Sequence, residues 1–284
     1  MNQVSLESYK NDFERAWCPG CGNFGILNGI QQTLVNLNLP PDNVVICTGI
    51  GQAPKLPHYM NVNTFNGLHG REVATAQAIK LANNNLTVVV HAGDGGAYGE
   101  GGNHFIHAIR RNVDITVVVH DNHIYGLTKG QASPTTDEGT VTKVNPEGVS
   151  SRPMNPLALA VSQQASFVAQ TLSSNSKHMI EVLSAAINHK GFSYVNILQP
   201  CVTWDHVHTY KFYNEHTEVL NENYDNENLM KALELTLKTD GKIPLGIIYK
   251  NSRKAHRSYS ETELPLYNHQ VSRTGIDSIL NKFR

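Results

Sequence analysis

What this chain of 284 residues lacks already excludes several kinds of protein. It has only four cysteines, too few for a disulfide-stabilised secreted scaffold of this length. Its 23 Lys and Arg almost balance its 24 Asp and Glu, so no excess of positive charge marks a surface for nucleic acid or for an anionic membrane. It has no apolar run near 18 residues and no secretory signal pattern, so we expect a soluble, cytoplasmic protein that acts on small molecules with protein partners.

Strand and helix patterns alternate along most of the chain. Strands are predicted at residues 44–47, 86–91, 115–120, 167–171, 194–198 and 245–249, and helices at 24–37, 71–82, 100–111, 156–163, 177–189 and 226–239. This order predicts an α/β fold with a parallel sheet, right-handed crossovers and helices on both faces. We expect one domain over residues 1–220 and a C-terminal extension over 221–284 that packs on the domain or on a partner subunit.

Asp94 and Asn122 each follow a predicted strand, and Asp94 lies between Gly93 and Gly95. In a parallel sheet, ligands bind beyond the carboxyl ends of the strands, so both side chains are expected at one edge. Mg²⁺ prefers oxygen ligands and usually keeps only one or two protein side chains. The glycines would let a pyrophosphate approach the backbone closely, although an Asp between two glycines is also a common turn.

The cysteines form a second candidate site. Cys18 and Cys21 are spaced so that both thiols can point at one metal, as in zinc sites, iron–sulfur sites and redox dithiols. Cys47 and Cys201 fall at the ends of two predicted strands and bring the total to four, the number that a [4Fe–4S] cluster needs. A structural zinc site in an assembly protein is the non-enzymatic alternative.

Taken together, the motifs resemble the beta subunit of a 2-oxoacid:ferredoxin oxidoreductase, most closely the 2-oxoglutarate type. The resemblance covers residues 10 to 212 and is carried by residues 17–22, 49–51, 67–71, 93–95, 122–128, 130–131, 133–135 and 199–201. It implies a thiamine diphosphate-binding domain with Mg²⁺ and a [4Fe–4S] cluster. It also implies coenzyme A, a 2-oxoacid, ferredoxin, and an alpha subunit that carries the pyrimidine-binding domain.

The resemblance also assigns residues to each cofactor. Asp94, Asn122 and the carbonyl of Ile124 would ligate Mg²⁺, and Cys18, Cys21, Cys47 and Cys201 would hold the cluster. Thiamine diphosphate would contact Ile50, Gly51, Gln52, His69, Gly93, Asp94, Gly95, Gly96, Asn122, Ile124, Gly126, Leu127 and Thr128.

The chain departs from the family pattern at Gln52, where a cluster cysteine tends to follow Gly-Ile-Gly directly. One interpretation is that Cys47, five residues earlier, takes its place. Alternatively, three thiolates and another ligand hold the cluster, or the cluster is lost. The total of four cysteines favours the first interpretation.

Three further residues are predicted to act near the reacting centre. His69 lies in a glycine-bounded loop that could present its ring to the diphosphate or the reacting carbon, although a single loop histidine usually just lies on the polar surface. Leu127 is expected against the thiazolium or the substrate tail, and an ordinary core leucine is the alternative. Lys55 resembles a basic residue that pairs with a second substrate carboxylate, although most lysines are simply solvated.

The implied reaction is oxidative decarboxylation of a 2-oxoacid with coenzyme A, giving acyl-CoA, CO₂ and reduced ferredoxin. Lys55 favours 2-oxoglutarate, hence succinyl-CoA, over pyruvate or a broad range of 2-oxoacids. A non-redox thiamine diphosphate-dependent decarboxylase subunit is the main enzymatic alternative. We find no carboxylate placed to activate the aminopyrimidine, so the chain is expected to be inactive without its partner.

Overall fold

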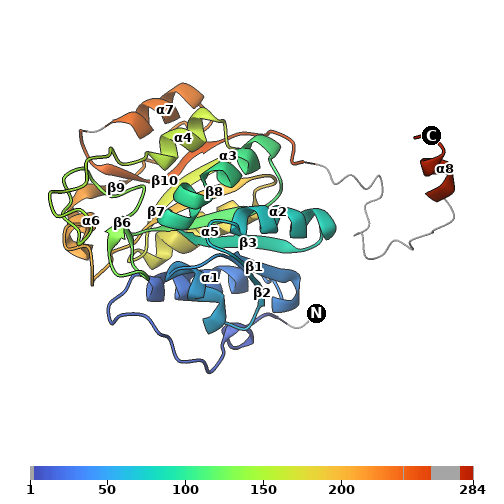
Figure 1. The fold of residues 1–284 in the computed structure, drawn as a ribbon, viewed down its shortest axis with the longest axis horizontal. Helices are drawn as coiled ribbons and strands as arrows, with labels where there is room; N and C mark the ends of the chain where they lie inside the picture. The colour runs from blue at the N-terminus through green and yellow to red at the C-terminus, as the bar shows by residue number, and fades with distance from the viewer. Residues whose placement is uncertain (1–2, 239, 257–275, 284) are drawn as a thin grey trace.

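The computed structural model describes residues 3–238, 240–256 and 276–283. An eight-stranded sheet forms the centre of the fold (Figure 1). The strand order is β2-β1-β3-β4-β8-β7-β10-β9. The strands are β1 (Val44–Thr48), β2 (Asn63–Asn66), β3 (Thr87–Gly93), β4 (Thr116–Asp121), β7 (Phe167–Leu172), β8 (Ser193–Leu198), β9 (Thr217–Val219) and β10 (Ile243–Lys250). Neighbouring strands are parallel except for the antiparallel pair β10–β7.

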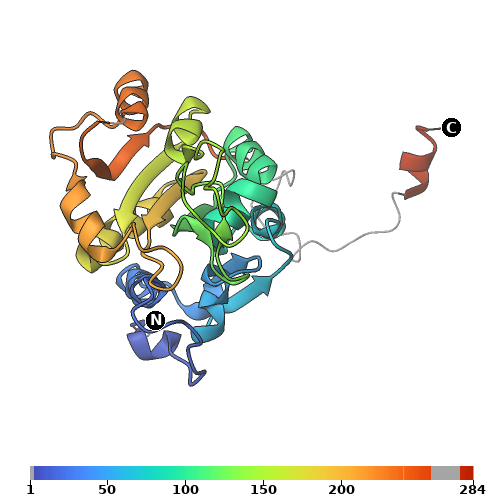
Figure 2. The ribbon, with the colours of Figure 1, turned by 60° about the vertical axis from the view of Figure 1, so that its left-hand side comes forward.

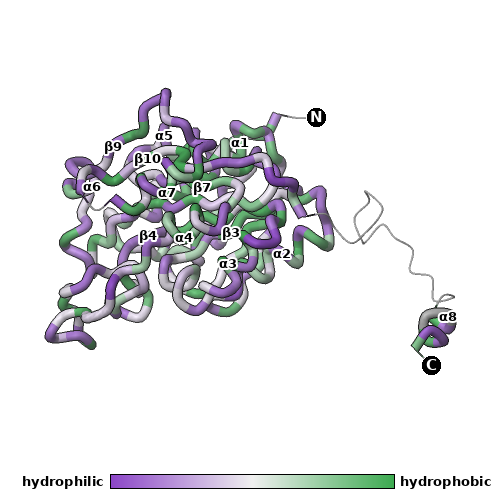
Figure 3. The backbone as a smooth tube through the Cα atoms, turned by 90° about the horizontal axis from the view of Figure 1, so that it is seen from above, coloured by the Kyte–Doolittle hydropathy of each residue, from purple (hydrophilic) through white to green (hydrophobic). Residues whose placement is uncertain are grey.

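Helices cover both faces of the sheet, which confirms the predicted α/β class. One face carries α1 (Asn23–Asn36) and α5 (Ser176–Asn188), whereas the other carries α2 (Glu72–Ala82), α3 (Gly102–Arg111), α4 (Pro156–Ser162) and α7 (Leu229–Leu237). In α1 the buried residues Ile26, Ile30 and Leu34 recur at helical spacing and form one apolar stripe against the strands. Hydrophilic segments lie mostly toward the outside of the molecule in Figure 3.

Successive side chains of the buried strands point alternately into two hydrophobic cores, one on each face of the sheet. Val44 and Ile46 pack toward α1 and α5, whereas Val45 and Cys47 pack toward α2 and α3. Successive side chains of a strand point to opposite faces of the sheet, so this division follows directly from the strand geometry. This alternation turns the Cys47 side chain toward α2 and α3.

The predicted helices and strands are present, with bounds shifted by a few residues, but several short elements were not predicted. Strand β2 is exposed at all four residues and has Phe65 as its single apolar residue, so it carries no hydrophobic pattern. Strand β9 has three residues, and α6 (Tyr210–His216) buries only Tyr213. Strand β10 was expected, but its antiparallel direction was not.

Toward its C-terminus the chain returns to the sheet. Helix α7 packs against α4, and β10 pairs with β7, so the part of the expected extension that precedes residue 251 is built into the α/β layers. The described residues also include the short helix α8 (Ile276–Leu280). Contact of the extension with a partner subunit stays a prediction, and residues 257–275 lie outside the described residues. No helix of the described part has the length and apolar character of a membrane span.

The loops that follow the parallel strands gather at one edge of the sheet. The segment from residue 126 to 155 contains only the two-residue strand β6 (Gln131–Ala132), which pairs with β5 (Ile124–Tyr125). It runs beside the loop that follows β8, shown in green and orange in Figure 2. This edge holds the candidate active site.

Candidate active site

A cavity of about 510 Å³ opens at the carboxyl edge of the sheet. All of the residues predicted to contact the cofactor line it, so the structure brings together segments that are far apart in sequence. The lining residues are Ile50, Gly51, Gln52, Ala53, Pro54, His69, Gly93, Asp94, Gly95, Gly96, Glu100, Asn122, Ile124, Tyr125, Gly126, Leu127, Thr128, Gln131 and Ala132.

Asp94 follows the last residue of β3 and is almost fully buried. Its Oδ2 accepts hydrogen bonds from Ser133 Oγ at 2.5 Å and from Thr135 Oγ1 at 2.8 Å. Burial and the neighbouring Asp121 carboxylate raise the pKa of Asp94 to about 7. Two buried carboxylates this close repel each other, so the site is electrostatically suited to a divalent cation.

Asn122 and Ile124 supply the other oxygens predicted to bind Mg²⁺. They follow β4 and line the same cavity as Asp94. The Asn122 Oδ1 atom accepts a hydrogen bond from the Ile124 backbone N–H at 3.1 Å, which orients the side chain. One carboxylate, one amide oxygen and one carbonyl form the hard oxygen set that Mg²⁺ prefers, so these residues fit the ion.

The backbone after Asp94 comes unusually close to Tyr125. Residues Gly95–Glu100 form a π-helical turn (η4), a rare conformation that often occurs at functional sites. A Cβ atom at Gly95 would lie 2.1 Å from the Tyr125 ring, and one at Gly99 would lie 2.8 Å from its hydroxyl. Glycine at both positions therefore lets Tyr125 form one wall of the cavity.

His69 is held at the cavity by two contacts. Its Nδ1 lies 2.8 Å from the Ile50 carbonyl oxygen, and its Nε2 lies 3.0 Å from Oε2 of Glu100. A carbonyl can only accept, so Nδ1 carries a proton. The Tyr125 hydroxyl also donates to Glu100 Oε2 at 3.2 Å.

Sequence reasoning missed Glu100, Tyr125, Ser133 and Thr135 as functional candidates. Ser133 and Thr135 were noted only as part of a motif, because nothing in their spacing shows that their hydroxyls reach Asp94. Glu100 could have been suspected from its place at the end of a glycine-rich segment that begins with the Asp94 motif.

Of the two residues predicted near the substrate, Leu127 lines the cavity and Lys55 does not. Leu127 lines the cavity and is 40% exposed, so it is not an ordinary core leucine. Lys55 lies on the 3₁₀ helix η3 (Ala53–Tyr59), immediately after the cavity residues Ala53 and Pro54. It is half-buried and has no ion-pair partner in the part of the chain that the structure describes, which leaves its ammonium group available.

Three of the four cysteines lie near one another. Burial raises the pKa of the Cys21 thiol, and the nearby Cys201 and Cys18 thiols raise it further. The Gln199 side chain donates to Cys21 Sγ at 3.4 Å. Trp17 donates to the carbonyl of the cavity residue Gln52 at 2.9 Å, so the Cys18–Cys21 segment adjoins the cavity wall.

Cys47 does not join this group, which corrects the expected set of four. It lies within β1, is fully buried, and packs in the core on the α2 and α3 side of the sheet, whereas Cys21 packs against the core on the α1 side. Burial, with the nearby Glu72 charge, raises the pKa of the Cys47 thiol to about 12. The number of cysteines was misleading because it took no account of which face of the strand Cys47 occupies.

This combination of a parallel α/β sheet and an Asp–Asn cavity at its carboxyl edge defines a thiamine diphosphate-enzyme domain. Residues 47–197 match the thiamine pyrophosphate enzyme family, C-terminal TPP binding domain. Residues 201–265 match the family that describes the C-terminal part of the pyruvate ferredoxin oxidoreductase beta subunit.

Comparison with individual relatives identifies the family more specifically. The chain is 42% identical over 248 residues to the 2-oxoacid:ferredoxin oxidoreductase subunit beta of a Sulfolobus species, covering 83% of this chain and 81% of that protein. It is 45% identical over 195 residues to the 2-oxoglutarate oxidoreductase subunit KorB of Mycobacterium tuberculosis, covering 69% and 52%. The chain belongs to the beta-subunit family of the 2-oxoacid:ferredoxin oxidoreductases.

A solved structure shares the whole fold. The 2-oxoglutarate:ferredoxin oxidoreductase from Magnetococcus marinus with 2-oxoglutarate, coenzyme A and succinyl-CoA bound has a chain that is 35% identical to this one. The TM-score is 0.92, and the match covers 99% of this chain and 97% of that chain.

Proposed function

We propose that this chain, together with an alpha subunit, catalyses oxidative decarboxylation of 2-oxoglutarate with coenzyme A to succinyl-CoA, CO₂ and reduced ferredoxin. The observation that carries the proposal is the buried Asp94 carboxylate, which lies near Asp121 and lines a 510 Å³ cavity together with Asn122 and Ile124. Names of relatives and of the solved structure support the substrate. Pyruvate or a broad 2-oxoacid range is the alternative specificity.

In this proposal Asp94, Asn122 and the Ile124 carbonyl hold Mg²⁺, and the glycine-rich turn after Asp94 receives the diphosphate. When bound, thiamine diphosphate would supply nucleophilic carbon chemistry toward the 2-oxo group. The protein contributes position and charge. His69, fixed between Ile50 and Glu100, presents its ring to the cavity, and Leu127 would pack against the thiazolium or the substrate tail.

An iron–sulfur cluster on Cys18, Cys21 and Cys201 would accept electrons next to the cavity. The three thiols fit a cluster only in part, because the described cysteines provide three ligands on this side of the sheet rather than four. We therefore propose three thiolates and another ligand. A non-redox decarboxylase subunit, the alternative, requires no cluster.

Lys55 would bind the distal carboxylate of 2-oxoglutarate. Its ammonium group has no ion-pair partner in residues 3–238, 240–256 and 276–283, and the preceding residues Ala53 and Pro54 line the cavity. A charge-assisted hydrogen bond to a carboxylate in a partly desolvated site is strong. Pyruvate lacks that carboxylate.

Anaerobic co-purification of the chain with its alpha subunit tests the proposal. We expect bound thiamine, iron with broad visible absorbance, and CoA-dependent reduction of ferredoxin that is fastest with 2-oxoglutarate in a panel of 2-oxoacids. Thiamine without iron or visible absorbance would favour the non-redox decarboxylase. Zinc in place of iron, with no thiamine, would contradict the proposal altogether.

A further inference from the structure

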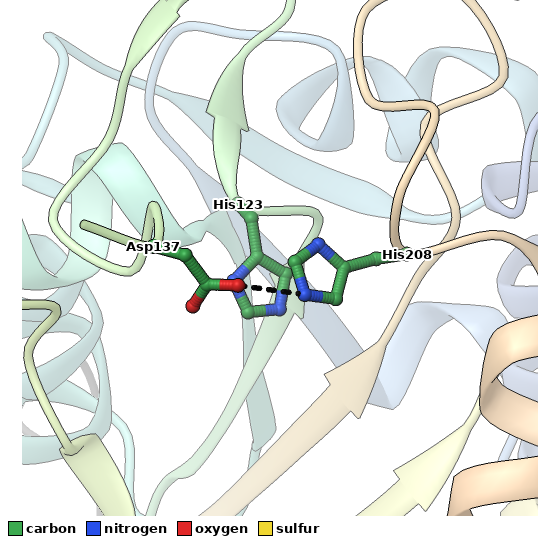
Figure 4. Close-up of side chains that lie close together, drawn as sticks. All are labelled: His123, Asp137 and His208. Atoms are coloured by element: carbon green, nitrogen blue, oxygen red, sulfur yellow. Dashed lines mark ion pairs between the residues drawn. The ribbon is translucent and has the colours of Figure 1, made fainter. Parts of the chain in front are cut away.

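A second group of metal-ligating side chains lies outside the cofactor cavity. His123 follows β4, Asp137 lies in the long loop after β6, and His208 lies in the loop after β8. Each offers one ligand atom, and these atoms all lie within 4.8 Å of one another (Figure 4). The three residues line a separate cavity of about 770 Å³, and no described residue lines both cavities.

Both imidazole rings are oriented by acceptors on their Nδ1 atoms. His123 Nδ1 lies 2.7 Å from the Thr135 carbonyl oxygen, and His208 Nδ1 lies 2.7 Å from Oδ2 of Asp205. Carbonyl and carboxylate oxygens only accept, so each Nδ1 carries a proton and each ring can offer Nε2 to a metal. Outer partners of this kind, a carboxylate or a carbonyl behind the histidine, accompany most metal-bound histidines.

Asp137 completes the group with a carboxylate. Its Oδ2 lies 3.2 Å from His208 Nε2, along the dashed line in Figure 4. It is about half exposed, so the group can be reached from solvent. Asp137 and Asp205 both contact the His208 ring, and against the opposing effect of burial their hydrogen bonds raise the pKa of His208 to about 9. A divalent cation bound here would take the place of the positive charge that His208 supplies to the two carboxylates.

From this arrangement we propose that His123 Nε2, His208 Nε2 and Asp137 bind a divalent transition-metal ion of the Zn²⁺ type. Two imidazoles and one carboxylate with an open fourth position favour Zn²⁺, Co²⁺ or Fe²⁺ over Mg²⁺ and Ca²⁺, which prefer oxygen ligands. The ion replaces the Nε2 proton of His208, which is released to solvent. Binding also requires side-chain movement, because the rings are stacked, 4.2 Å between centroids and 14° between planes.

The site would join three separate segments next to the cofactor cavity. His123 lies between Asn122 and Ile124, the proposed Mg²⁺ ligands, and has a positive φ of 58°. Such a conformation persists where surrounding contacts hold it. A metal on His123 would therefore fix the backbone that presents Asn122 and Ile124, while tying the long loop to the segment after β8.

Metal titration of the full-length chain tests the proposal. The background carries serine at Cys18, Cys21 and Cys201, so that thiols do not bind the probe, and excess Mg²⁺ occupies the oxygen site. The probe is Co²⁺, followed by its visible absorption and by calorimetry. We expect one strongly bound Co²⁺ in the parent protein, and an affinity at least about 100-fold lower in His208→Gln and in Asp137→Ala.

Two further variants make the test specific. His206→Gln changes an exposed histidine two residues from His208 and is expected to bind like the parent. Asp205→Asn removes the negative charge behind His208 and puts a neutral amide in its place, and we expect a loss of about 10- to 100-fold. Equal Co²⁺ stoichiometry and affinity in the parent, His208→Gln and Asp137→Ala would overturn the proposal. Because Asp137 is half exposed, its variant keeps the test valid if His208→Gln fails to fold.

Discussion

The carboxylates of Asp94 and Asp121 share one hydroxyl. Thr135 Oγ1 lies 2.8 Å from Asp94 Oδ2 and 2.7 Å from Asp121 Oδ1, yet it has a single proton to donate. Asp121 is further held by the Asn196 amide at 3.1 Å. Asp94 likewise has a second donor, Ser133 Oγ at 2.5 Å, and of the two carboxylates it is the one that lines the cavity.

This relationship predicts how pH affects the cation-free protein. The folded-state pKa of Asp94, about 7, is above its unfolded value, so between about pH 4 and pH 7 only the unfolded state releases the proton. The Asp94 contribution to the free energy of unfolding should fall as pH rises through this window, by at most about 1.4 kcal/mol per pH unit.

Thermal melts of wild type and of Asp94→Asn at several pH values give the measurement, because their difference isolates Asp94 from other titrating groups. The stability of wild type relative to Asp94→Asn should decrease as pH rises. Mg²⁺ with thiamine diphosphate should reverse this loss in wild type and have no such effect in the variant. A difference that stays constant with pH would contradict the raised pKa.

Gly95→Ala should damage the cavity. The new Cβ would lie 2.1 Å from the Tyr125 ring, so the ring must move, and this movement disturbs the hydrogen bond of its hydroxyl to Glu100. Overpacking of this kind typically costs about 1–3 kcal/mol of stability, and the displaced wall should weaken thiamine diphosphate binding.

The matched control for this change is Gly102→Ala. A Cβ at Gly102, the first residue of α3, meets nothing within 4 Å. This variant should keep wild-type stability or gain up to about 1 kcal/mol, with unchanged cofactor affinity by calorimetry. Similar losses in both variants would show that any side chain in this region is harmful, rather than one that meets Tyr125.

Most of the fold could be predicted from hydrophobic periodicity. Strands such as β3 and β4 are runs of valine bounded by glycine or polar residues, and α1 has a regular apolar stripe. Hydrophobic periodicity did not reveal strands with little burial, such as β2, whose four residues are exposed. It also could not show that β10 runs antiparallel to β7, because a strand buried on both faces looks the same in either direction.

The site was predictable where it depends on strand ends and not where it depends on side-chain direction. Asp94 and Asn122 follow adjacent parallel strands, so their meeting follows from topology. Cys47 also lies near a strand end, but the alternation of side chains turns it into the opposite core from Cys21. The contacts of Thr135 and Asp137 depend on the path of the long loop, which no local pattern encodes.

Replacing the cysteines one at a time should separate Cys47 from the other three. Cys21→Ala should abolish the iron content and visible absorbance of the anaerobically purified complex, because it removes one of three neighbouring thiols. Cys47→Ala should retain both and lose at most a few kcal/mol of stability, because it only leaves a small gap in a packed core. Loss of iron in a folded Cys47→Ala variant would show that Cys47 is a cluster ligand together with the other three cysteines.

Lys55→Ile should change which 2-oxoacid the complex prefers. Removing the ammonium group takes away the proposed partner of the distal carboxylate of 2-oxoglutarate, whereas pyruvate has no such group to lose. A lost charge-assisted hydrogen bond of about 1.5–3 kcal/mol lowers kcat/KM for 2-oxoglutarate by about 10- to 100-fold and leaves the value for pyruvate nearly unchanged. Lys55→Arg keeps the charge and should retain most of the preference. Equal losses on both substrates would mean that Lys55 supports the cavity wall instead of reading the substrate.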